Sequence, residues 1–109
     1  MDRVFYSAKS AFVHKPAAVI SSSRRAGSVT SMDVLNKHLS ISEMPIVTSN
    51  YWNEVHGHTP SDVEQDREGL DTMYALGKNM AWMLKCIEAG KKAGIEIPQN
   101  TKRTTNFIR

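Results

Sequence analysis

Apolar residues follow helical spacing in three parts of the chain and form two short runs between them. The spacing predicts helical structure within residues 2–12, a short helix over 30–39 and a long helix over 60–93. The runs "AAVIS" (17–21) and "MPIVTSN" (44–50) predict strands. Because "AAVIS" is apolar on both faces, we expect it to be buried on both sides. This element order predicts an α/β fold with a parallel sheet.

Capping signals support the two later helices. Thr30 with Asp33 three residues later fits a capping pair. The long helix has an N-cap, a proline at N1, an acid at N3 and a glycine stop: Thr59, Pro60, Asp62 and Gly94. Its core-facing stripe would consist of Leu70, Met73, Gly77, Met80, Leu84 and Ile87.

The long helix would extend for about 50 Å at 1.5 Å per residue, which exceeds the sheet of a small domain. We therefore expect a bend near Gly69 or a projection toward a partner. Trp82 and Met83 lie off the stripe and indicate a second buried face. The single cysteine, Cys86, would be a small buried hydrophobe.

Two parallel strands are too few for a stable sheet. Either other chains supply the missing strands, or the sequence is the second half of a larger domain. We therefore interpret residues 1–98 as a partial domain and residues 99–109 as a polar C-terminal tail.

Composition narrows the class of protein. The chain has 109 residues, a net charge of +3 and one cysteine, so an internal disulfide and a four-cysteine zinc site are excluded. This cysteine usage favours a reducing cytoplasm. No apolar run approaches the roughly 20 residues of a membrane span. The basic excess is mild and partly terminal, so we expect neither a membrane nor a nucleic acid as partner.

The segment "SSSRRAGS" (21–28) follows the first predicted strand. In parallel α/β sheets ligands bind beyond the carboxyl ends of the strands, where helix N-termini meet the loops. Arg24 and Arg25 offer cationic donors, and Gly27 permits a tight backbone. Spacing alone leaves two interpretations open, a ligand loop and a solvated surface loop.

Three stretches carry a resemblance: "DRVFYS", "KPAAVISSSRRAGSVTSMDVLNKHLSISEMPIVTSNYWNEVHG" and "QDREGLDTMYALGKNMAWMLKCIEAG". Together with the closing "TNFIR", they resemble the C-terminal half of the NAD(P)H-dependent FMN reductase family. The similarity is to its multimeric flavodoxin-like branch, which is related to the iron–sulfur flavoproteins. The resemblance implies the second half of a five-stranded, doubly wound flavodoxin-like sheet, with two strands, a short helix and a long C-terminal helix.

The resemblance also implies an FMN site. Six residues after the fourth strand of the family fold would line the flavin ring: Ser22, Ser23, Arg24, Arg25, Ala26 and Gly27. Three more, after the last strand, would stand near the same site or a neighbouring subunit's flavin: Tyr51, Trp52 and Asn53. The family's FMN phosphate loop, and the cluster cysteines where they occur, belong to the half that this sequence lacks.

The implied activity is electron transfer from NAD(P)H through FMN to a small-molecule or protein acceptor, in a homo-oligomer such as a dimer or tetramer. The flavin performs the chemistry, so no catalytic side chain is assigned. His56 and His58 with Glu54 are more typical of a loop than of a metal site, so no metal ligand is assigned either.

Two other functions stay open. The long helix, with its second apolar face, could make the chain a non-catalytic oligomerisation or partner-binding module. Alternatively, Arg24, Arg25 and the basic tail could bind a phosphate backbone, although the acidic start of the long helix argues against this.

Overall fold

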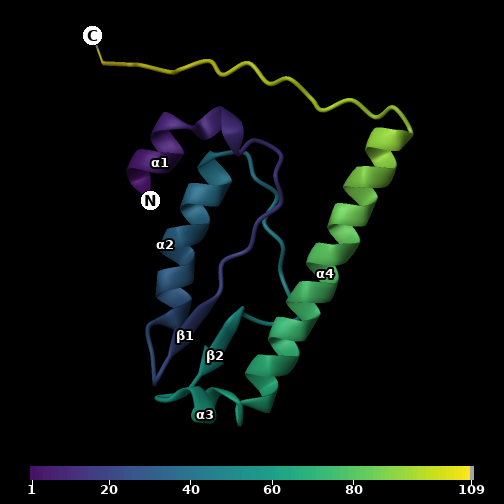
Figure 1. Cartoon of the computed structure of the whole chain (residues 1–109). Helices are drawn as coiled ribbons and strands as arrows, with labels where there is room; N and C mark the ends of the chain where they lie inside the picture. Colours follow the sequence, from purple (N-terminus) through teal and green to yellow (C-terminus); the bar gives the residue numbers. More distant parts are fainter. Residues whose placement is uncertain (109) are drawn as a thin grey trace.

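The computed structural model describes residues 1–108 and contains helices on either side of a two-stranded parallel sheet (Figure 1). Its elements are α1 (Asp2–Ser7), the 3-10 helix η1 (Lys9–Ala11), β1 (Ser21–Ser23), α2 (Ser28–Ile41), β2 (Glu54–His56), α3 (Pro60–Val63) and α4 (Arg67–Lys92). Helix α2 contacts β1, and α4 contacts β2. The mixed α/β class, the parallel pairing and the long C-terminal helix confirm the coarse prediction.

Both strands lie further along the chain than predicted. The 17–21 and 44–50 runs meet at a single bridge, Ala17 to Ile46, and the ladder resumes only where Ser21 pairs with Glu54. Three residues separate the paired positions on the first segment and seven on the second, so the second bulges outward. β1 is also only half-buried, which corrects the prediction of a strand covered on both faces.

Helix α2 begins before the predicted 30–39 segment and ends after it. Gly27 is the N-cap with φ of 93°, a left-handed conformation that favours glycine and turns the chain into the helix. The predicted Thr30–Asp33 capping pair is wrong, because both residues lie inside the helix. One face of α2 joins the core, a cluster of Val19, Met32 and Leu39 against which Phe5 packs.

The 60–93 segment consists of two helices. Thr59 and Asp62 form the predicted capping box of α3, with Pro60 at N1. The chain then leaves the helical path at 64–66, so the break precedes the bend expected at Gly69. Asp66 caps α4, its Oδ1 accepting from the Gly69 N–H at 3.0 Å. A Cβ at position 69 would collide with this carboxylate, which explains the glycine.

The buried face of α4 differs from the predicted stripe. Gly69, Thr72 and Leu76 are buried, while Gly77 and Leu84, which the prediction placed in the core, are exposed. The prediction of a second buried face is wrong for Trp82, whose exposed fraction is 66%. Cys86 is also exposed rather than buried. The helix ends where expected, at Ala93, with Gly94 in the left-handed region (φ 80°).

Candidate functional site

The two strands end side by side at Ser23 and His56, and this carboxyl edge of the sheet carries the candidate site. The loop 24–27 leads from β1 into the N-terminus of α2. On the neighbouring strand, Gly57 donates its N–H to the Ser23 carbonyl at 3.2 Å and thereby extends the pairing past the strand ends. The "SSSRRAGS" segment therefore occupies the position at which open α/β sheets bind ligands.

The predicted loop residues differ in solvent exposure and in their contacts with the rest of the chain. Ser22, Arg24, Arg25 and Ala26 are exposed, and within residues 1–108 neither arginine forms an ion pair. Open space surrounds the position of a Cβ at Gly27. Two guanidinium groups and the backbone beside Gly27 are therefore available to an anionic or polar ligand.

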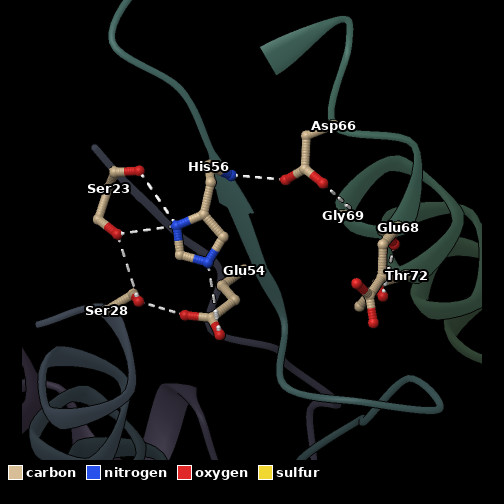
Figure 2. Close-up of polar contacts among 8 residues, drawn as sticks. All are labelled: Ser23, Ser28, Glu54, His56, Asp66, Glu68, Gly69 and Thr72. Carbon is tan, nitrogen blue, oxygen red and sulfur yellow. Dashed lines mark hydrogen bonds and ion pairs between the residues drawn. The ribbon is translucent and has the colours of Figure 1, made fainter. Parts of the chain in front are cut away.

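Ser23 takes part in a polar network within the chain (Figure 2). Its Oγ lies 3.4 Å from the Ser28 Oγ, to which it donates, and 3.3 Å from His56 Nδ1. The Ser28 hydroxyl in turn donates to Glu54 Oε2. His56 Nε2 completes the network 3.8 Å from Glu54 Oε1. Four side chains from β1, α2 and β2 thus link the two strands to the start of α2.

Glu54 and His56 have different environments in this network. The Glu54 side chain is 12% exposed and the His56 side chain 46% exposed. The Glu54 carboxylate lies at the first residue of α2, where the positive end of the helix dipole favours an anion. Because Glu54 already occupies this position, an external phosphate is not expected there. His56 presents its imidazole to solvent.

Asp66 fixes the outer side of β2. Its Oδ2 accepts from the His56 backbone N–H at 2.7 Å, while its Oδ1 caps α4 (Figure 2). These hydrogen bonds, first the one from Gly69 and then the one from His56, lower the pKa of the Asp66 carboxyl below its ordinary value. Asp66 therefore stays ionised and holds strand and helix together.

The second predicted group precedes β2 instead of following the last strand. Tyr51 and Trp52 are exposed on the bulge and lie against each other, with ring centroids 4.8 Å apart. Asn53 is buried, and its Nδ2 donates to the Val19 carbonyl at 3.1 Å. Asn53 therefore replaces a missing backbone bond of the interrupted ladder.

The structure does not join the two predicted groups directly. In the part of the chain that it describes, no hydrogen bond or ion pair links residues 24–27 to residues 51–53. Sequence reasoning missed the network of Glu54, His56 and Asp66. The alternation of Glu54 and His56 about Val55, typical of one face of a strand, was the available signal.

Metal binding has no support in the described residues: no group of three or more His, Cys, Asp or Glu side chains among them could hold an ion. Between Met1 and Ile108, no helix combines the length and apolarity that a membrane span requires. Comparison of the chain with protein-family models, curated proteins and solved structures found no match.

Proposed function

We propose that the chain supplies the ring-facing part of an FMN site in a flavodoxin-like NAD(P)H oxidoreductase. The observation that carries the proposal is the exposed Arg24–Gly27 loop at the carboxyl edge of a parallel strand pair. In a flavodoxin-like sheet of order 2-1-3-4-5, the last two strands are neighbours and parallel. The pairing of β1 with β2 is compatible with that order.

The residues of the loop fit one end of FMN better than the other. Arg24 and Arg25 can donate to the polar edge of an isoalloxazine ring, and the open space at Gly27 lets a flat ring approach the backbone. The phosphate has no comparable place, because Glu54 occupies the start of α2. In the proposal, the phosphate is held by residues beyond this chain.

FMN, when bound, accepts a hydride from NAD(P)H and passes electrons to the acceptor. The chain's own residues bind and orient the ring. Positive charge from Arg24 and Arg25 favours uptake of electrons by a nearby ring, because reduction adds negative charge. The half-exposed His56 imidazole lies at the same edge of the sheet.

The test is flavin retention by the purified chain. After addition of FMN and removal of the excess, we expect a shifted flavin absorbance band to stay with the protein, and NAD(P)H oxidation is then assayed. Replacing Arg24 and Arg25 by alanine should weaken binding at least about tenfold, equivalent to about 1.4 kcal/mol. Arg103→Ala, in the exposed tail, is the matched control. Equal binding by the double variant would refute the proposed site. A colourless wild-type chain would mean that this chain alone is not a flavoenzyme.

A second candidate is a non-catalytic oligomerisation module. The observation that favours it is the apolar surface of α4, where Tyr74, Trp82 and Leu84 are exposed. Size-exclusion chromatography with light scattering tests this function without flavin. A defined oligomer that never retains FMN would favour the module over the oxidoreductase.

A further inference from the structure

In the extended segment 17–23, every second residue forms backbone hydrogen bonds with the rest of the chain. The odd-numbered residues use their backbone groups toward β2 and the segment before it: Ala17, Val19, Ser21 and Ser23. The residues between them, Ala18, Ile20 and Ser22, turn their N–H and C=O groups to the opposite side. Within residues 1–108, no second strand pairs with that side.

This outer edge of β1 is open to solvent and carries neither a charged residue nor a proline. Ile20 is 60% exposed, and Ser22 is exposed beside it. Neither a charged residue nor a proline occurs from Ala17 to Ser23. Natural proteins usually protect exposed strand edges with such residues, because an open edge pairs with other strands.

The outer edge of β2 is protected, by contrast. The N–H of His56, which would face a new strand, donates to Asp66 Oδ2 at 2.7 Å. The Glu54 N–H is also occupied, donating to the Trp52 carbonyl at 2.7 Å. One edge of the sheet is therefore blocked by the chain itself, while the other is left free to pair.

The size of the molecule shows that an additional surface is uncovered. Its radius of gyration is 17.2 Å, whereas a compact domain of this length has about 13 Å. Its accessible surface is 8759 Å², against about 6,100 Å² for a compact monomer of this mass. Part of the excess lies on the extended segment after α4.

We propose that β1 pairs antiparallel with β1 of a second copy of this chain, joining two sheets into one of four strands. The backbone donors and acceptors of an extended edge are complementary to themselves about a two-fold axis, so one edge suffices for a closed dimer. Four strands also exceed the minimum of three for a stable sheet. The pairing brings the uncharged Ile20 side chains of the two copies close to the axis.

Pairing of β1 with a second copy does not require flavin, but it affects which strands can complete a flavin-binding sheet. A further strand of a complete flavodoxin-like sheet would pair with the same edge, so such a strand competes with the second copy. Pairing through the edge of β1 leaves the Arg24–Gly27 loop at the end of the strand accessible.

The decisive variant is Ile20→Pro in the full chain. The Ile20 N–H faces the outer edge, so proline removes no hydrogen bond of the monomer but blocks pairing there. Ile20→Val is the matched control, because it keeps the N–H and a β-branched side chain. Light scattering after size exclusion should give twice the 12.2 kDa of one chain for the wild type and Ile20→Val. Ile20→Pro should raise the dissociation constant at least about tenfold. A monomeric wild type, or equal association of the proline variant, overturns the proposal.

Hydrogen exchange of the wild type keeps the test independent of whether the proline variant folds. The amides of Ile20 and Ser22 should exchange at least about tenfold more slowly at high chain concentration than at low, because the dimer occupies them by mass action. The Ser21 amide, already bonded to Asn53, serves as the internal control. Exchange at Ile20 and Ser22 that is independent of concentration overturns the proposal.

Discussion

At the scale of single residues, Asp66 connects more parts of the site than any residue that the sequence singled out. One carboxylate oxygen caps α4 and the other satisfies the outer N–H of β2. The sequence predicted acidic residues near this helix start but not their partners, because the strand at 54–56 was interpreted as a loop. Residue type and spacing are enough to predict that an acid caps a helix. Which strand the capping residue also contacts depends on tertiary packing, so the sequence pattern does not reveal it.

Asp66→Ala should lower the free energy of unfolding by about 1–2 kcal/mol at pH 7, the usual value of a lost helix cap. The lowered pKa of Asp66 sets the pH dependence. Because the folded pKa is below the unfolded value of 3.8, the stabilisation is present above pH 3.8 and is lost as pH falls through the folded value. Urea unfolding of both proteins from neutral to acidic pH measures this.

Asp71→Ala is the matched control for that experiment, since Asp71 is an exposed acid on the same helix. Its effect on stability should be within about 0.5 kcal/mol. An Asp66→Ala deficit that persists unchanged in acid would show that the charge of the carboxylate does not contribute.

At the scale of elements, the sequence identified the helices better than the strands. Periodic spacing over many residues located α2 and the 60–92 region, and the Thr59 capping box was correct in detail. The strands were displaced by several residues, because short apolar runs specify extended structure without specifying register. The pairing of polar Ser21–Ser23 with Glu54–His56 depends on contacts between distant segments, to which local pattern is insensitive.

The rotated face of α4 gives a test at this scale. Leu76 is 8% exposed and Leu84 is 50% exposed, although the predicted stripe contained Leu84 and not Leu76. Leu76→Ala should therefore reduce the free energy of unfolding by about 2–3 kcal/mol, the cost of a buried cavity. Leu84→Ala should cost less than about 1 kcal/mol in the monomer. Urea unfolding of the two variants measures both free energies. A larger loss of stability for Leu84→Ala than for Leu76→Ala would support the predicted stripe.

At the scale of the whole molecule, the sequence predicted two parallel strands, and the structure contains two, fewer than the three needed for an independently stable sheet. The structure adds how the two edges differ: within residues 1–108 no strand pairs with the outer edge of β1, while Asp66 closes the edge of β2. The candidate loop is less well determined by sequence. Its position at the carboxyl edge follows from strand order, but the involvement of Ser23 with Ser28 and His56 could not be read from spacing.

The incomplete sheet also predicts how thermal stability depends on concentration. If two copies share a sheet, unfolding is coupled to dissociation, and mass action raises the Tm with chain concentration. For a tenfold increase in concentration, a rise of a few degrees is expected from the roughly 1.4 kcal/mol involved and the entropy of unfolding of a domain of this size. Calorimetry of wild type and Ile20→Pro measures it: the wild type should shift and the proline variant should not. A Tm that is constant in both would mean that the open edge of β1 is tolerated by a stable monomer.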